Sequence, residues 1–598
     1  MTSTRLYRTA VLFLLLMPGC VTHRPHDTPM QVVPSAGASD AIQRSDAFAQ
    51  QLLHVMGQFD PEEASSVGLT EAEGRVSDLS LEADARAVAA YRAVEKDFRA
   101  RAETEQDIDV RADLLILADA AGQRADDRAP WEPSESGDRA YVTVARVLYS
   151  GVTGVLTEPV TPARARAALA RLNAYAGLDG STPLAEAAEA RLKTWLTQHP
   201  GSGSETSGPA RTKLQRDLAS TQTLLQGLAE SCRAAGVPDL DRPLGVLKTQ
   251  LAHYDAFLTE AVLPRARAED RLSEPQYRRA LRERGIAMDP EALALGARKA
   301  FAQTLAELKP LAAEVAGSLG LPGDDYRTVL AALRRQQVPP GEVLALYQQR
   351  LTDIDAILRA QHLVTVPTLP LSIRVASAAE GVMMAAPHYN MPSLMGEGGG
   401  GDFVLPAPEA SQGPRAMDDF TSPAASWWLT AHEGHPGHGM QFAAMMSKPM
   451  SLARRYFAFN SANCEGWGLY AEGLVMPYLP PEGRLGVLQA RLMREAHTFL
   501  DIELNLGRLT AEEAHRVLTD EVVMSQGWAD LCLQRYTFMM PGQAPSYFYG
   551  ATELESIRSE VQRRQGKSFN LQDFNDFVLS QGLVPPTALR KLVDAHWP

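Results

Sequence analysis

Three histidines and a glutamate lie within seven residues of this chain, in the stretch HEGHPGH. The histidines are His432, His435 and His438, and the carboxylate is that of Glu433. Zinc prefers imidazole and carboxylate ligands, and a hydrolytic zinc site keeps one position for water. A nearby carboxylate can then accept a proton from that water. The residue types and their spacing therefore predict a metal site.

The spacing does not show directly which histidine is the second ligand. A regular H-E-x-x-H zinc motif places its histidines four residues apart. Here the fourth residue after His432 is Pro436, which has no N–H and whose ring clashes with the preceding turn. We therefore expect the helix to be kinked or bulged at 434–437. His435 is reachable without a bulge and His438 needs one, so helix geometry leaves both open.

A third ligand is expected on a neighbouring helix. The stretch NCEGWGLYAEGL, residues 463–474, contains Glu465 and Glu472. They are seven residues apart, so both can point inward from the same helix face. The expected site then spans residues 424–475. Cys464 points about 100° away from Glu465 and is expected to be a buried thiol.

The rest of the chain is predicted to be mainly helical from residue 45 onward. Apolar residues recur at intervals of three and four at Leu344, Tyr347, Leu351, Ile354 and Leu358, the pattern of a half-buried helix. Further helices are expected where Ala, Leu, Arg and Glu predominate, at residues 81–103, 161–178, 209–235, 289–318 and 484–504.

Residues 382–406 break the helical pattern with prolines and a run of glycines. Such residues disfavour a helix and predict a short β-hairpin that turns at Gly396–Gly401. An edge strand near the metal would allow a peptide substrate to pair with it. A flexible surface loop is the alternative. His388 lies in this region.

The N-terminus is read as a targeting segment. Arg5 and Arg8 precede the short apolar run AVLFLLLM, and PGC ends it at Cys20. We expect a signal peptide at 1–19, then a lipidated Cys20 and a flexible tether to residue 44. The protein would be an exported lipoprotein of the cell envelope, anchored to the membrane at the periplasmic face or at the outer membrane, with plain secretion as the alternative.

Composition excludes some classes of function. The chain has 598 residues and a formal net charge of −14, which argues against nucleic acid as a partner. Besides Cys20 it has only Cys232, Cys464 and Cys532, too few for a disulfide framework. The sequence does not show whether any two of them pair.

Three motifs in order resemble a bacterial family of exported proteins, the domain of unknown function 885. They are HEGHPGHGMQ, then EGWGLYAE at 465–472, then PGQAPSY at 541–547. The similarity extends to EEASSVGLTEAEGRVSDLS at 62–80 and GKSFNLQDFNDFVLSQG at 566–582. The family is regarded as zinc peptidase-like, similar to thimet oligopeptidases and thermostable carboxypeptidases. The resemblance thus implies a large helical peptidase fold with a deep substrate channel.

The resemblance also assigns roles to residues. It implies that His432, His438 and Glu465 hold zinc and that Glu433 is the general base. His435 becomes a neighbour of the site. Tyr547 is expected to stabilise the oxyanion that forms during hydrolysis. Further residues are expected to support a ligand or to bind the substrate backbone or its carboxylate: Gln441, Glu472, Arg535 and Gln543.

Three positions depart from the family pattern. Gly439, Asn505 and Asn575 stand where histidine is common. None of these removes an expected ligand or the base, but a lost histidine that positions substrate would change substrate range or rate.

The sequence therefore predicts a zinc metallopeptidase, a hydrolase that acts on peptides. Two alternatives stay open: a non-catalytic lipid-anchored binding protein on the same fold, and a zinc amidase that acts on non-peptide amides. Substrate sequence, exopeptidase or endopeptidase mode and oligomeric state are not readable from the sequence.

Overall fold

The computed structural model describes residues 40–130, 137–156, 160–199, 208–268, 270–392, 401–406 and 416–598. These residues are predominantly helical, which confirms the predicted mainly α fold. Among them, no helix combines the length and apolar character needed to cross a membrane. The expected signal peptide and Cys20 lie outside the described residues.

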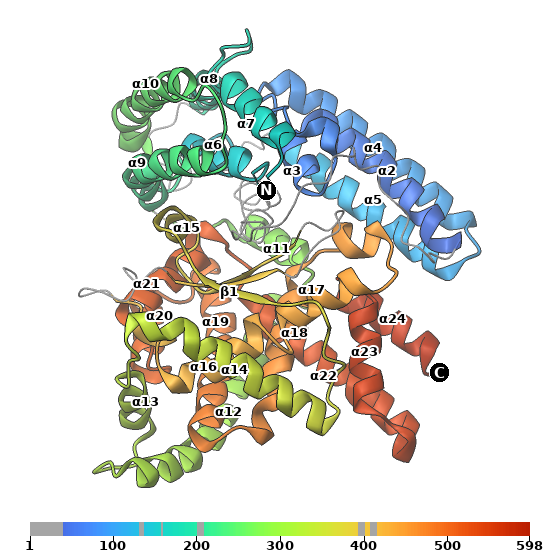
Figure 1. The fold of residues 1–598 in the computed structure, drawn as a ribbon, viewed down its shortest axis with the longest axis vertical. Coiled ribbons are helices and arrows are strands. Elements are labelled where there is room, and N and C mark those ends of the chain that lie inside the picture. The colour runs from blue at the N-terminus through green and yellow to red at the C-terminus, as the bar shows by residue number, and fades with distance from the viewer. Residues whose placement is uncertain are drawn as a thin grey trace.

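The helices of residues 40–257 form an upper lobe in Figure 1. Four of them pack together in the N-terminal part of the chain: α2 (Asp40–Phe59), α3 (Pro61–Ser66), α4 (Leu81–Thr104) and α5 (Ile108–Arg128). Five more follow: α6 (Val144–Thr153), α7 (Pro162–Tyr175), α8 (Leu184–Gln198), α9 (Arg211–Ala234) and α10 (Asp241–Phe257). Helix α2 begins at Asp40, so the last five residues of the expected tether are helical instead.

The lower lobe contains the remaining helices and the sheet. Its first part comprises α11 (Glu274–Glu283), α12 (Pro290–Leu319), α13 (Tyr326–Arg334), α14 (Pro340–Gln361) and α15 (Ala378–Met383). The motif-bearing part comprises α16 (Pro423–Glu433), α17 (His438–Ser447), α18 (Ser461–Val475) and α19 (Pro481–Asn505). The chain ends with α20 (Ala511–Arg516), α21 (Gln526–Gln534), α22 (Pro545–Gln565), α23 (Leu571–Ser580) and α24 (Pro586–His596).

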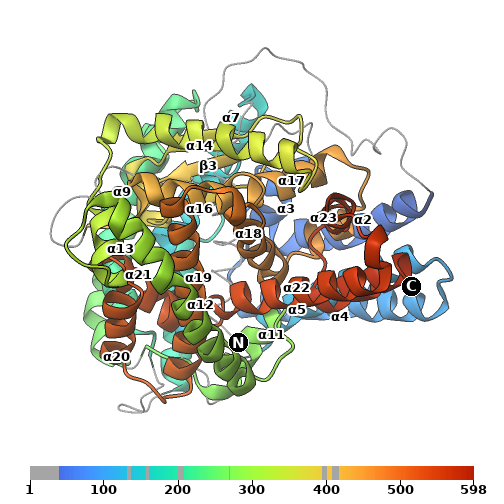
Figure 2. The same ribbon diagram turned by 90° about the horizontal axis from the view of Figure 1, so that it is seen from below.

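The helices predicted from composition are all present, as α4, α7, α9, α12 and α19. The apolar stripe of α14 also behaves as predicted. Tyr347, Ile354 and Leu358 are buried, while Leu344 and Leu351 are partly buried against the same core. Figure 2 shows α14 lying across β3 and α16, so it covers the helix that carries the histidine motif.

The predicted hairpin is confirmed in its two strands. Strand β2 (His388–Asn390) pairs antiparallel with β3 (Asp402–Leu405), with Tyr389 opposite Phe403. Strand β1 (Ser372–Val375), which was not predicted, pairs parallel with β3 on its other side. The predicted turn falls mostly outside the described residues.

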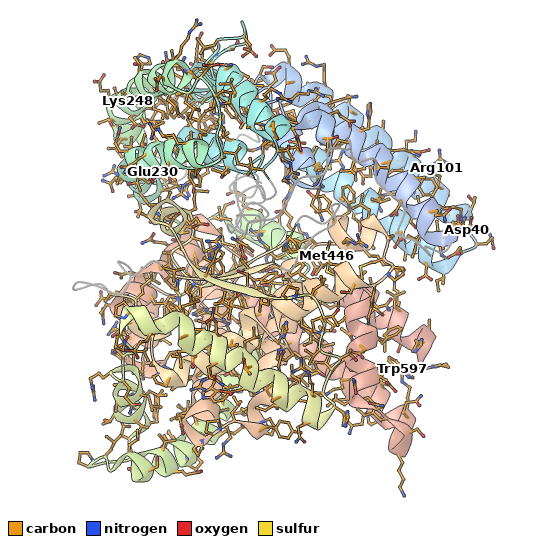
Figure 3. The ribbon with its side chains drawn as sticks, viewed as in Figure 1. Asp40, Arg101, Glu230, Lys248, Met446 and Trp597 are labelled. Atoms are coloured by element: carbon orange, nitrogen blue, oxygen red, sulfur yellow. The ribbon has the colours of Figure 1, made fainter. Side chains whose placement is uncertain are left out.

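Two hydrophobic cores hold these elements together. One is formed by α6–α10, with Trp195 and Tyr254, and also takes in Ala379 and Met383 of α15. The other extends from α2–α5 through the whole lower lobe. The lobes are therefore joined by a continuous core on the side of α2–α5. Figure 3 shows Met446, at the end of α17, on the part of the lower lobe that faces the upper one.

Candidate metal centre

The histidine motif is divided between two helices. Ser422 caps the start of α16 by accepting a hydrogen bond from the backbone N–H of Ala425, and α16 ends at Glu433. Residues 434–437 are not helical, and α17 starts at His438. The irregularity predicted at 434–437 is present, but it is a break between two helices and not a kink or bulge within one. Pro436 cannot supply the next backbone hydrogen bond of α16.

Two features hold the turn between these helices. Gly437 lies so close to the preceding helix that a Cβ atom there would be 1.9 Å from the carbonyl oxygen of His432. Trp467, on α18, donates its indole N–H to the carbonyl oxygen of Pro436 at 2.9 Å. Trp467 therefore fixes the path of the turn that leads to His438.

Three potential ligand atoms converge where α16, α17 and α18 meet. The Nε2 atoms of His432 and His438 are each 3.5 Å from Oε2 of Glu465, and one ligand atom from each residue lies within 4.8 Å of the others. This Oε2 atom is buried and has no hydrogen-bond partner among the described residues. Ligands held about 2.1 Å from zinc in a tetrahedron are separated by about 3.4 Å, so the three groups fit such an ion.

The electrostatics of the cluster agree with this arrangement. Burial alone would raise the pKa of Glu465, but His432 and His438 hold it well below its usual range. Burial would also lower the pKa of His432, yet Glu465 and Glu472 raise it to about 9. The cluster therefore keeps Glu465 ionised and favours a cation beside it.

A second glutamate orients the first ligand. Glu472, on the same face of α18 as predicted, lies with its Oε1 atom 2.8 Å from Nδ1 of His432. A carboxylate on Nδ1 fixes the ring so that Nε2 faces the metal position, and such partners are common around metal-bound histidines. Nδ1 of His438 instead lies 3.6 Å from Sγ of Cys464, which is buried as expected.

This contact leads to a first prediction. Glu472→Gln retains the side-chain shape but removes the negative charge next to His432. We expect the affinity for zinc to fall by about 10- to 100-fold, the cost typical of losing such a partner. Zinc titration of the metal-free variant measures it, and an unchanged affinity would show that Glu472 does not support the ligand.

His435 lies outside the cluster of three. Its Nδ1 atom is 2.7 Å from Oδ1 of Asp355 on α14, and its buried Nε2 atom has no partner among the described residues. Because α17 starts at His438, that residue faces Glu465 without any bulge. The structure thus favours His438 over His435 as the second ligand.

Glu433 lies beside the cluster. It is buried, and none of the described residues donates a hydrogen bond to its carboxylate. Burial raises its pKa above the usual range, although the nearby His432 and His438 oppose this. A carboxylate with these properties is suited to accept and return a proton near neutral pH.

Residues of the PGQAPSY motif cover another side of the cluster. The Tyr547 ring stacks near that of His432, with 5.9 Å between the ring centroids. Burial raises the pKa of Tyr547, so its phenol remains a hydrogen-bond donor at neutral pH. Gln543 donates to Oε1 of Glu465 at 2.9 Å, and Arg535 donates to Oε1 of Gln543 at 2.7 Å. Each of these residues therefore lies near the site, as predicted.

One predicted supporting residue has a different role. Gln441 makes no hydrogen bond to the three proposed ligands in the described part of the chain; its amide donates to Oδ1 of Asn463. It lies one helical turn beyond His438, but this face of α17 packs against the start of α18. Gln441 therefore positions the two helices relative to each other.

Two of the three departures from the family pattern have a structural role. Asn575 accepts a hydrogen bond from Tyr470 and donates to the carbonyl oxygen of Leu363. Asn505 donates to the carbonyl oxygens of Asp501 and Tyr536. Both asparagines are buried, and their hydrogen bonds tie α23 and α19 to neighbouring segments.

Cys232, Cys464 and Cys532 are all free and buried. His388 lies at the start of β2, where its Nδ1 atom contacts the carbonyl oxygen of Ala386.

A glycine on α18 gives a second prediction. A Cβ atom on Gly468 would lie 2.5 Å from Cε1 of His432. We expect Gly468→Ala to displace the imidazole and lower zinc affinity by about tenfold or more, as for other changes that misorient a ligand. The matched control is Gly473→Ala on the same helix, where the nearest atom is 3.5 Å away. It should bind zinc normally, and equal affinity in both variants would contradict the prediction.

The comparisons with known proteins agree with the fold. The family model for bacterial proteins of unknown function called DUF885 matches residues 61–593. The chain belongs to this family. No curated protein is similar enough in sequence to count as a match.

Two solved structures share the architecture of this DUF885 protein, and both are provisionally described as lipoproteins. The protein from Colwellia psychrerythraea is 18% identical, with a TM-score of 0.73, over 94% of this chain and 99% of its own. The protein from Shewanella oneidensis, described as being of unknown function, is 17% identical, with a TM-score of 0.68, over 93% of this chain and 100% of its own. At these identities the likeness shows the fold alone.

Proposed function

We propose that this DUF885 protein is a zinc-dependent peptidase that hydrolyses peptide bonds outside the cytoplasm. The observation that supports this most directly is the convergence of His432, His438 and Glu465 beside the buried, unbonded carboxylate of Glu433. A binding protein without catalysis has no chemical need for such a carboxylate at this position. The same constellation would also serve an amidase.

The chemistry can be divided among the residues present. Zinc, when bound by the three ligands, supplies a Lewis acid that polarises the scissile carbonyl and acidifies water. Glu433 accepts the proton of the attacking water and later donates it to the leaving amine. Tyr547 donates a hydrogen bond to the oxyanion that develops on the carbonyl. Glu472 holds His432 in place through Nδ1.

The cellular location is part of the proposal. The charged and apolar start of the chain, the cysteine at position 20 and the lipoprotein descriptions of the two structural relatives all support a lipid-anchored protein of the cell envelope. Peptides present in that compartment would be its substrates.

Metal analysis joined to a peptide-library digest tests the function. The purified protein should contain close to one zinc per chain, and it should cleave peptides only when metal is bound. Removal of zinc by a chelator should abolish cleavage, and re-addition should restore it. A zinc-loaded protein that cleaves none of the peptides would overturn the proposal.

A further inference from the structure

A cavity of about 190 Å³ lies between the two lobes. The upper lobe contributes residues of α3, α6 and α9 to its wall, and the lower lobe contributes residues 383–385 and the π-helical segment Arg535–Met539 with Met540. The three proposed ligands are not part of this wall, but Arg535 is. Arg535 donates to Gln543, which in turn donates to the proposed ligand Glu465, so the cavity lies beside the metal centre.

Part of the cavity wall is apolar and consists mainly of methionine side chains. Its apolar side chains on the lower lobe include Met383, Met384, Phe538, Met539 and Met540. Methionine side chains are unbranched and polarizable, and they adapt to apolar groups of different shapes. This part of the wall is suited to an apolar side chain of a ligand.

The charged groups of the wall are mostly paired with one another. Arg191 contacts Asp84 at 2.7 Å, Lys213 contacts Asp217 at 3.3 Å, and Arg128 contacts Asp60. These pairs neutralise the charges that the lobes bring into the cavity. The paired side chains therefore have little capacity to bind a charged group of a ligand.

Arg535 differs from these cations. Its hydrogen-bond partners in the described chain are neutral: Oε1 of Gln543 at 2.7 Å and the hydroxyl of Tyr547 at 3.4 Å. Buried or half-buried arginines are normally paired with an acid, and the guanidinium group matches a carboxylate in shape. Arg535 thus offers an anion site on a cavity wall that is otherwise apolar or already paired.

We propose that this cavity receives the carboxyl-terminal residue of a short peptide, with the terminal carboxylate on Arg535 and the last side chain against the methionines. A carboxyl-terminal residue carries its carboxylate and its side chain on the same Cα atom, so it can contact Arg535 and the methionines together. An internal glutamate has its charge at the tip of its side chain and would leave the apolar wall unfilled. This inference rests on the proposed peptidase function.

The same contacts define where the peptide would be cut. Only Gln543 separates the guanidinium of Arg535 from the proposed ligand Glu465, through hydrogen bonds of 2.7 and 2.9 Å. One residue of extended chain spans about 3.5 Å, so a carboxylate on Arg535 places the scissile bond about one or two residues from the end. The enzyme would act as a carboxypeptidase that removes one or two residues.

The test compares three N-acetylated peptides of the same length: one ends in leucine with a free carboxylate, one ends in leucine amide and one ends in glutamate amide. We expect the wild type to prefer the free acid over the leucine amide by about 30-fold or more in kcat/KM, as for loss of a buried charged partner. The glutamate amide should resemble the leucine amide. If it is cut as well as the free acid, a side-chain carboxylate suffices and the proposal is overturned.

Substitution of Arg535 shows whether this side chain binds the substrate carboxylate or only positions Tyr547 and Gln543. In Arg535→Gln the preference for the free acid should fall to less than about threefold, whereas Arg535→Lys, which keeps the charge, should retain part of it. If Arg535 only positions Tyr547 and Gln543, both peptides should slow by the same factor and the preference should survive. That result would overturn the proposal.

Binding without catalysis provides the second readout. Calorimetry with metal-free protein should show N-acetyl-leucyl-leucine binding about tenfold or more tighter than its amide, a charge-assisted difference that Arg535→Gln abolishes. Equal binding of acid and amide to the wild type would overturn the inference even if peptides are hydrolysed. If zinc-loaded protein hydrolyses no peptide at all, the proposed function fails, while this measurement still reports on the cavity.

Discussion

Replacement of Glu433 by glutamine should lower turnover by about 100-fold or more, the usual contribution of a general base. Glutamine has nearly the same shape as glutamate but cannot accept the proton of the attacking water. Because Glu433 is not one of the converging ligands, zinc content should remain close to that of the wild type. Stopped assays with a cleaved library peptide, together with metal analysis of the same preparation, measure both quantities.

Glu495→Gln is a suitable matched control. Glu495 is also buried, and it accepts a hydrogen bond from Thr304 at 2.8 Å. Burial raises its pKa to about 8, so it is already largely protonated at neutral pH and an amide replaces it with little change in charge. Its turnover should stay within about twofold of the wild type, in line with a general base acting elsewhere. Wild-type turnover in Glu433→Gln would show that another group is the base or that the site does not hydrolyse peptides.

The sequence predicted most of the site because helical periodicity is a local property. Glu465 and Glu472 are two turns apart, and the structure places one in the ligand cluster and the other on Nδ1 of His432. The same logic located α14 from its apolar stripe. In each case the spacing alone determined which side chains share a face.

The path of the chain between His432 and His438 could not be predicted in this way. Pro436 excludes a regular helix, but a bulge and a complete break are both compatible with that local restriction. What distinguishes them is long-range, since Trp467 donates to the Pro436 carbonyl oxygen from a different helix. A contact between residues 31 positions apart leaves no periodic signal in the sequence.

The cavity was also beyond the reach of sequence patterns. Its wall combines α3 and α9 of the upper lobe with the π-helical segment that begins at Arg535 in the lower lobe. Arg535 was expected near substrate from its motif, but its lack of an acidic partner depends on which side chains the two lobes bring together. Such a property exists only in the folded protein.

The two remaining histidines of the motif should respond very differently to substitution. His438→Ala removes a converging nitrogen, so zinc affinity should fall by more than about 100-fold, beyond the loss typical of an outer partner, and activity should disappear with it. His435→Ala should retain zinc affinity to within about tenfold, because its ring contacts Asp355 and not the cluster. Asp355 also contacts Arg359 at 3.3 Å, so the substitution does not leave its carboxylate without a partner. Zinc titration of the two metal-free variants decides the matter: tight binding by His438→Ala together with metal loss in His435→Ala would show that the wrong histidine has been assigned as the ligand.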